Sequence, residues 1–164
     1  MKKGTIHIYT GEGRGKSPAA LGRAVQAAAF GASVVIIQFL KGKGLDDNEF
    51  VRRLEPEIKF FRFERSDENF DELSPEKKEE EILNIRNGIN YARKVLSTEE
   101  CSLLILDEVL ALVEKGILSA QDLKNILDQR GETDVIMTGA ILTDEVRVLA
   151  DEVSKIDTLG FEIS

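Results

Sequence analysis

Short apolar segments alternate along the chain with longer segments whose apolar residues recur at helical spacing. Residues 4–9 alternate between polar and β-branched or aromatic side chains, while residues 32–40, 102–107 and 134–138 are nearly continuous apolar runs. Such runs are typical of strands that are buried on both faces of a sheet. Further strands are predicted at residues 58–63, 153–156 and 161–163.

Helices are predicted between these strands, over residues 19–30, 48–54, 74–96, 109–115, 120–129 and 143–150. The longest helix has a clear start, with Ser74 as its N-cap and Pro75 at the first helical position. Residues 62–73 show no regular spacing of apolar residues. We expect them to be disordered without a ligand because they have little apolar area to bury. The alternation of strands and helices predicts an α/β fold with a mostly parallel sheet, helices on both faces, and ligands at the carboxyl ends of the strands.

The run Thr10-Gly-Glu-Gly-Arg-Gly-Lys-Ser17 connects the first predicted strand to the first helix. A strand, a glycine loop, a Lys-Ser pair and a helix in this order form the phosphate-binding P-loop arrangement. Its glycines allow backbone N–H groups to turn towards phosphate oxygens, and the start of the helix adds a positive dipole end. In this arrangement Lys16 reaches the terminal phosphates and the Ser17 hydroxyl binds Mg²⁺. The alternative is a glycine-rich surface turn before an ordinary helix, since Thr10 occupies the position of the usual first glycine.

Residues 103–108 are an apolar strand that ends in the acidic pair Asp107-Glu108. In P-loop proteins, a carboxylate at this edge of the sheet holds Mg²⁺ opposite the phosphate loop, directly or through water. An acidic residue after a buried strand can instead cap the following helix. The glycine loop earlier in the chain favours the metal-binding interpretation.

Composition limits the class of protein. The 164 residues, 42% of them hydrophobic, predict one globular domain over residues 1–164, with no apolar run long enough to span a bilayer. The net charge of −8 argues against nucleic-acid binding, and its distribution is uneven: residues 1–63 carry +5 and residues 64–164 carry −13. The basic part holds the glycine loop, which suits an anionic ligand. The single cysteine, Cys101, excludes an internal disulfide, and with the absence of a signal peptide it makes the cytoplasm the expected compartment.

Three other features have two interpretations each. His7 lies in a predicted strand and is expected to be structural, with a metal or acid–base role as the alternative. Lys41 and Lys43 at the end of the second strand either contact a ligand or lie in a solvated loop. Of the phenylalanines near the unpatterned segment, two or more should be in the core, and one could face a flat ligand; these are Phe60, Phe61, Phe63 and Phe70.

Four stretches together resemble the P-loop family of ATP:corrinoid adenosyltransferases. These are TGEGRGKS with its Ala-rich helix, VVIIQFLKG at 34–42, LLILDEVLALVEKGIL at 103–118, and VIMTG with the later LADEVS within 135–154. The resemblance covers most of the chain and accounts for Thr10, because the family has a threonine before its glycines. It implies a P-loop NTPase-like fold of the RecA type, usually assembled as a homodimer, and an enzyme that binds MgATP and a reduced corrinoid such as cobalamin.

In that family, cobalt(I) attacks the ribose C5′ of ATP, forms a carbon–cobalt bond and expels triphosphate. The resemblance therefore implies ATP and Mg²⁺ as cofactors and a corrinoid as substrate, with no role for nucleic acid or membrane. Lys16 and Glu108 are the implied catalytic residues, and Ser17, Asp107 and Glu108 are the implied metal ligands. The implied nucleotide-binding residues are Thr10, Gly11, Glu12, Gly13, Arg14, Gly15, Lys16 and Ser17.

The chain also departs from the family pattern. Pro18 replaces the second hydroxyl residue after the lysine, and Ala140 stands where the family has an arginine after Thr-Gly. The chain has no tryptophan and lacks the Phe-Thr-Trp stretch associated with the corrinoid side, and its tail lacks a basic-aromatic segment. These departures leave a second hypothesis open, namely a P-loop ATP-binding or ATP-hydrolysing protein of the same family without corrinoid activity.

Overall fold

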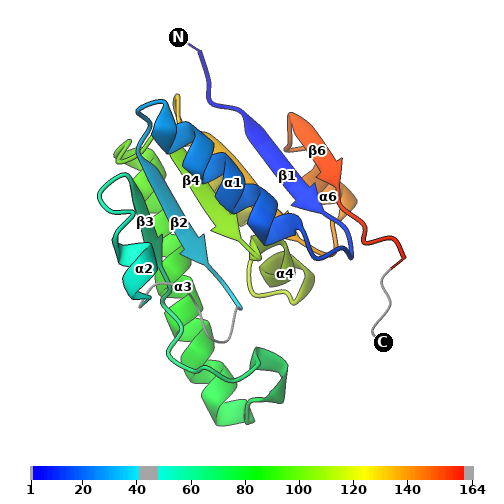
Figure 1. Ribbon diagram of the computed structural model, residues 1–164. Helices are drawn as coiled ribbons and strands as arrows, with labels where there is room; N and C mark the ends of the chain where they lie inside the picture. Colours follow the sequence, from blue (N-terminus) through cyan, green and yellow to red (C-terminus); the bar gives the residue numbers. More distant parts are fainter. Residues whose placement is uncertain (1, 41–47, 161–164) are drawn as a thin grey trace.

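The computed structural model describes residues 2–40 and 48–160, and its centre is a parallel sheet. Its strands are β1 (Ile6–Thr10), β2 (Val34–Gln38), β3 (Ile58–Phe61), β4 (Leu103–Asp107), β5 (Asp134–Gly139) and β6 (Glu152–Lys155). They lie in the order β3-β2-β4-β5-β1-β6, and each neighbouring pair is parallel. The predicted α/β fold with a parallel sheet is therefore confirmed, as Figure 1 shows.

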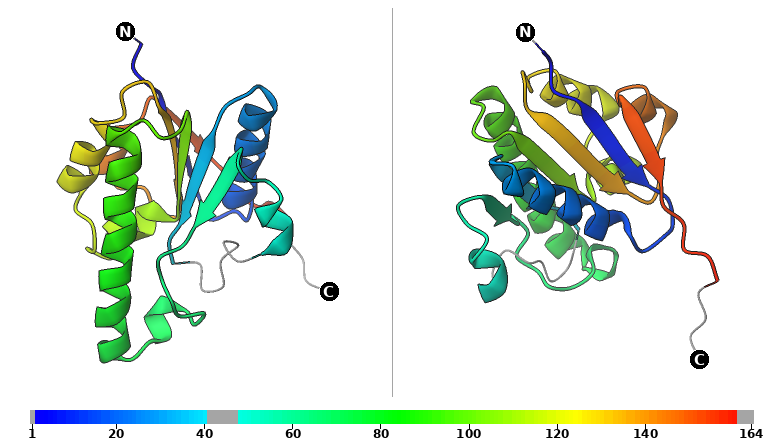
Figure 2. Two further views of the ribbon diagram at one scale, coloured as in Figure 1. Left: turned by 90° about the vertical axis from the view of Figure 1, so that its left-hand side faces the viewer. Right: turned by 45° about the horizontal axis from the view of Figure 1, so that its top comes forward.

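Helices cover both faces of this sheet, as predicted. They are α1 (Lys16–Ala29), α2 (Glu49–Arg52), α3 (Pro75–Ser97), α4 (Val109–Glu114), α5 (Ala120–Leu127) and α6 (Asp144–Arg147), with a 3₁₀ turn at Phe70–Glu72. α1 and α2 lie on one face, and α3, α5 and α6 lie on the other (Figures 1 and 2). No helix in the described part of the chain is long and apolar enough to cross a membrane.

The alternation of side chains along each strand divides the core into two clusters, one on each face. On the α1 face, small residues of the helix such as Ala20 and Ala24 pack on Ile36, Ile105 and Ile136. The opposite face is larger, with α3, α4 and α5 packed on side chains such as those of Ile8, Ile37 and Leu106. Because both faces are buried, the strands need the continuous apolar runs from which they were predicted.

Side chains cap the starts of two helices. The Ser74 side chain accepts a hydrogen bond from the Lys77 N–H, with Pro75 in the first turn of α3. Asn48 caps α2 in the same way, through the Val51 N–H. The predicted ligand contacts of Lys41 and Lys43 and the predicted strand at 161–163 lie outside the described residues.

The segment 62–73 has a defined conformation, so the expectation of disorder without a ligand is wrong. Polar contacts to the backbone contribute to this conformation. The buried Glu64 carboxylate accepts the Leu40 N–H at 2.8 Å, and the buried Glu81 carboxylate accepts the Arg65 N–H at 3.1 Å. The Arg62 guanidinium donates to the Ser66 carbonyl oxygen. Burial, together with the nearby Glu81 carboxylate, outweighs the Leu40 hydrogen bond and raises the pKa of Glu64.

All four phenylalanines near this segment also make apolar contacts. Phe60 is buried on the α1 face, while the rings of Phe61 and Phe63 pack against Tyr91 of α3, with centroids 4.8 and 5.5 Å away. Phe61 and Phe63, together with Phe70, are partly buried against the larger core cluster. The prediction that two or more of these side chains belong to the core is confirmed.

Candidate functional site

Four adjacent strands end at one edge of the sheet and bring four segments of the chain together. The glycine loop follows β1, Asp107 and Glu108 end and follow β4, Thr138 and Gly139 end β5, and residues 156–158 follow β6. Because β4, β5, β1 and β6 are neighbours in this order, these segments lie side by side (Figure 1). The glycine loop and the Asp107-Glu108 pair therefore lie at the edge where the parallel topology predicts a ligand.

The glycine loop turns sharply between β1 and α1. Gly11 has a φ of 110°, in the left-handed region that favours glycine. Lys16 is the first residue of α1, and its Nζ atom lies 2.8 Å from the Gly13 carbonyl oxygen, so its ammonium group folds back over the loop. The N–H groups in the first turn of a helix have no carbonyl acceptor within the helix. An anion held by this loop would therefore meet an ammonium group and helix N–H donors together.

Ser17, Asp107 and Thr138 form a hydrogen-bonded junction between the loop and the sheet. The Ser17 hydroxyl donates to Asp107 Oδ1 at 2.8 Å, and the Thr138 hydroxyl donates to the same oxygen at 2.6 Å. Asp107 is 3% exposed and Thr138 is fully buried, so water does not weaken the bond between these two side chains. The carboxylate that was predicted to face the loop therefore does so.

Glu108 has a constrained backbone at this junction. It is the N-cap of α4 with a φ of 65°, which is unusual for a residue other than glycine, and its N–H donates to Thr138 Oγ1 at 2.8 Å. Its side chain makes no capping hydrogen bond to α4. Gly139 follows Thr138 at the end of β5, and packing requires a glycine at this position because a Cβ atom would lie 2.3 Å from the Leu110 Cβ. Capping of α4 thus does not explain the Glu108 carboxylate.

The oxygen atoms at this junction suit Mg²⁺. Two adjacent ligands on an octahedral Mg²⁺, each at about 2.1 Å, are about 3 Å apart. Ser17 Oγ and Asp107 Oδ1 are 2.8 Å apart, so both could bind one ion after a small shift. Within the described residues, no group of three or more Asp, Glu, His or Cys side chains could hold a metal by itself. An ion held between Ser17 and Asp107 would take its remaining ligands from phosphate and water, as Mg²⁺ usually does.

An apolar cavity of about 200 Å³ opens beside this junction, between α1 and strands β2–β4. Its polar lining residues are Ser17, Gln38 and Asp107, and its apolar walls include Pro18, Leu21 and Phe60. Pro18 lies in the first turn of α1, where its missing N–H removes no intrahelical hydrogen bond. The cavity offers an apolar surface next to a charged site, as a substrate with a flat uncharged part and a charged part requires.

The structure separates the predicted nucleotide-binding residues into two groups. Lys16 and Ser17 direct their side chains to the loop and to Asp107, and the Thr10 hydroxyl donates to the Ala140 carbonyl oxygen at 3.3 Å. Glu12 and Arg14 are exposed. The structure thus brings Lys16 to the loop and Ser17 to Asp107, and leaves the side chains of Glu12 and Arg14 at the surface.

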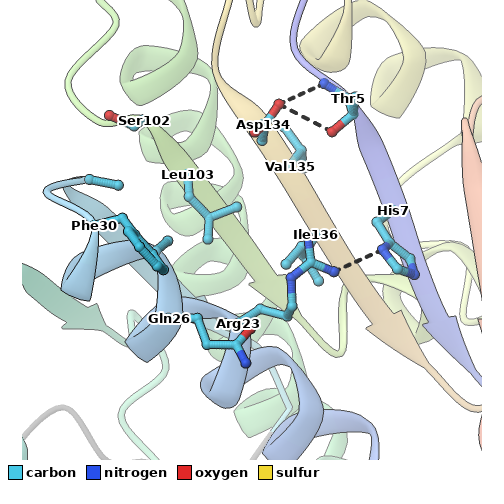
Figure 3. Close-up of a pocket in the computed structure, with 12 residues that line it drawn as sticks. Thr5, His7, Arg23, Gln26, Phe30, Ser102, Leu103, Asp134, Val135 and Ile136 are labelled. Atoms are coloured by element: carbon cyan, nitrogen blue, oxygen red, sulfur yellow. Dashed lines mark hydrogen bonds between the residues drawn. The ribbon is translucent and has the colours of Figure 1, made fainter.

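His7 lies in a separate pocket of about 340 Å³ on the α1 side, at the amino ends of β4 and β5. Arg23 reaches from α1 to His7 Nδ1 at 3.1 Å, as Figure 3 shows, while His7 Nε2 lies 2.9 Å from Ser154 Oγ. A guanidinium group only donates, so Nδ1 accepts and the proton lies on Nε2. Burial is the main cause that lowers the pKa of His7, and it outweighs the attraction of Glu152. These contacts agree with the structural role predicted for His7.

Sequence reasoning missed Thr138 and residues 156–158 as parts of this site. Thr138 entered the sequence analysis only as part of the VIMTG stretch. A hydroxyl group at the carboxyl end of a buried strand could have indicated a site residue. Residues 156–158 contain no recognisable motif. Their place beside the loop results from the pairing of β6 with β1.

Comparisons with known proteins identify the family of this chain. The family model described as ATP:corrinoid adenosyltransferase BtuR/CobO/CobP matches residues 2–161. A corrinoid adenosyltransferase of Escherichia coli strain K12 is 28% identical over 156 residues, which cover 94% of this chain and 77% of that protein. The corrinoid adenosyltransferase CobA of Salmonella typhimurium is 26% identical over the same length, with the same coverage.

A solved structure described as a DNA replication initiation factor superposes with a TM-score of 0.48 at 16% identity, over 94% of this chain and 40% of that chain. The family model carries the assignment, because it spans nearly the whole chain, including the glycine loop, the Asp107-Glu108 pair and the Thr138-Gly139 pair. The chain belongs to the ATP:corrinoid adenosyltransferase BtuR/CobO/CobP family.

Proposed function

We propose that this protein transfers the 5′-deoxyadenosyl group of ATP to the cobalt of a reduced corrinoid and releases triphosphate. Family membership supports the reaction, and one observation supports its location: the 2.8 Å contact between Ser17 Oγ and Asp107 Oδ1 beside the glycine loop. That contact joins a phosphate-binding loop to an oxygen donor set for Mg²⁺. The proposal assigns the reaction to this edge of the sheet.

In this proposal, the loop from Thr10 to Ser17 holds the triphosphate. Triphosphate is the leaving group, so negative charge increases on it as the C5′–oxygen bond breaks. Lys16 and the N–H groups at the start of α1 lie where they can stabilise that charge. Lys16 is therefore assigned a catalytic role.

Ser17, Asp107 and Glu108 are assigned to Mg²⁺, which supplies charge neutralisation on the phosphate oxygens when it is bound. Ser17 and Asp107 already share a hydrogen bond, so their oxygens are positioned before an ion arrives. Thr138 accepts the Glu108 N–H and so fixes the backbone from which the Glu108 carboxylate extends. Through this metal position Glu108 is also assigned a catalytic role.

A second function is supported by one specific observation. Ala140 follows Gly139 and is exposed, at the point where the family resemblance places an arginine. An alanine supplies no charge to a second anionic substrate. A member of the family that binds or hydrolyses ATP without acting on a corrinoid would tolerate this change.

The decisive experiment is anaerobic incubation of the protein with MgATP and chemically reduced cobalamin. We expect the absorption spectrum of the adenosylated product to appear together with one triphosphate per turnover. The Lys16→Ala variant, matched in concentration, serves as the control for uncatalysed reaction. Binding of MgATP with release of ADP and phosphate, and no adenosylated product, would instead establish the second function.

Three further features belong to this proposal. The metal is Mg²⁺, which a titration of activity with Mg²⁺ and Ca²⁺ tests, since Ca²⁺ prefers longer bonds and more ligands. The assembly is a homodimer, which light scattering coupled to gel filtration measures. The compartment is the cytoplasm, which cell fractionation measures.

A further inference from the structure

The segment that follows β6 runs alongside the glycine loop and bonds to it at three points. We call residues 156–158 the loop clamp. The Ile156 N–H donates to the Thr10 carbonyl oxygen at 2.7 Å, and the Gly13 N–H donates to the Ile156 carbonyl oxygen at 2.9 Å. The Arg14 N–H donates to Thr158 Oγ1 at 3.0 Å. Figure 2 shows this segment leaving β6 beside the loop that follows β1.

The approach of the loop clamp accounts for two of the glycines. A Cβ atom at Gly11 would lie 2.4 Å from the Ile156 carbonyl oxygen, and one at Gly13 would lie 2.5 Å from it. Both distances are far shorter than van der Waals contact with a backbone oxygen. Gly11 and Gly13 therefore permit a second backbone to lie against the loop, whatever they contribute to phosphate binding.

One peptide unit shows on which side of the loop the clamp lies. The Gly13 carbonyl oxygen receives Lys16 Nζ, while the Arg14 N–H of the same peptide unit donates to Thr158. In a trans peptide the C=O and N–H groups point in opposite directions. The clamp and the Lys16 ammonium group thus lie on opposite sides of this peptide, and the clamp does not occupy the side where Lys16 would meet phosphate.

We propose that Thr158 is a positioning residue for triphosphate binding. By accepting the Arg14 N–H it holds the Gly13–Arg14 peptide with its carbonyl group towards Lys16, so the loop is ordered before the ligand arrives. A loop that is already ordered loses less conformational entropy on binding. This inference rests on the proposed function, which places the triphosphate of ATP in this loop.

The test compares Thr158→Val, which removes the acceptor, with Thr158→Ser, which keeps it. Affinities of the full chain are measured by calorimetry for two probes, MgATP and inorganic tripolyphosphate with Mg²⁺. We expect Thr158→Val to raise the Kd of both probes by about three- to tenfold, the effect of losing one hydrogen bond. Thr158→Ser should bind like the wild type. Amide hydrogen exchange at Arg14 should be faster in Thr158→Val alone.

Thr158 is exposed, so its substitution should leave the melting temperature nearly unchanged and separate positioning from folding. An unchanged Kd in Thr158→Val overturns the inference. A lower Kd also overturns it, since the clamp would then compete with phosphate. If the wild type binds neither probe, both the proposed function and this inference are wrong. If the wild type binds both probes, the comparison of the variants tests the inference alone.

Discussion

Replacing Thr138 by valine removes a hydroxyl group that connects two strands and both acidic residues of the site. The hydroxyl donates to Asp107 Oδ1 at 2.6 Å and accepts the Glu108 N–H at 2.8 Å. Thr138 is fully buried, so water cannot replace either bond. Valine keeps nearly the same volume but supplies neither a donor nor an acceptor.

The size of the effect follows from these two bonds. In Thr138→Val the Glu108 N–H loses its partner, which costs about 1–3 kcal/mol. Asp107 Oδ1 loses the bond from Thr138 and keeps the one from Ser17. Together these losses should lower the free energy of unfolding by about 2–4 kcal/mol. Thr138→Ser keeps both bonds and loses one methyl group, which costs about 1 kcal/mol. Packing alone predicts the opposite order, because serine leaves a cavity and valine does not. The order of the two variants therefore separates hydrogen bonding from packing.

Urea unfolding of the wild type and both variants measures the stability order, and calorimetry with MgATP measures the effect on the site. We expect Thr138→Val to bind MgATP about tenfold more weakly, since Asp107 and Glu108 lose the group that orients them, and Thr138→Ser to bind it nearly as well as the wild type. If Thr138→Val is as stable as the wild type, or if Thr138→Ser is the more damaging change, the assigned role of Thr138 is refuted.

Three other predictions concern separate parts of the molecule. Lys16→Ala should weaken MgATP binding by about 2 kcal/mol or more through loss of a charge-assisted phosphate contact, and equal calorimetric affinities would remove Lys16 from the site. Burial raises the pKa of the Cys101 thiol to about 11, so a thiol reagent at pH 8 should label it only as the protein unfolds, and rapid labelling of the native protein would contradict its burial. Folding lowers the pKa of His7 from 6.5, so the contribution of neutral His7 to stability is complete above pH 6.5 and is lost as the pH falls towards the lowered value. His7→Gln should therefore reduce the pH dependence of the free energy of unfolding, which urea titrations at several pH values measure.

The helices, the strands and the two charged motifs of the site could be predicted because each depends on residues that are close together in the sequence. Continuous apolar runs identified the buried strands, and Ser74 with Pro75 marked the start of α3. The glycine loop and the Asp107-Glu108 pair were visible as residues at the ends of predicted strands. Parallel topology then placed both at the same edge of the sheet.

The contacts of Thr138 and Thr158 depend on which strands are neighbours in the sheet. Local sequence patterns do not specify this strand order. Thr138 reaches Asp107 only because β5 lies beside β4, and Thr158 reaches the loop only because β6 pairs with β1. The order of segment 62–73 was missed for a different reason. Part of its stability comes from Glu64 and Glu81, two carboxylates that are buried against backbone N–H groups, whereas the expectation of disorder considered only the small apolar area of the segment.

The strand order also determines which contacts hold the phosphate loop in its conformation. β1 lies between β5 and β6, which are both formed by the last third of the chain. The contacts of Thr10 with Ala140 and of Arg14 with Thr158 join residues 130 and 144 positions apart. Closing loops of this length costs conformational entropy, which local contacts within the loop do not supply. The loop therefore cannot be ordered locally, as its compact motif would imply, and any ligand that binds the ordered loop also stabilises the edge of the sheet formed by β6.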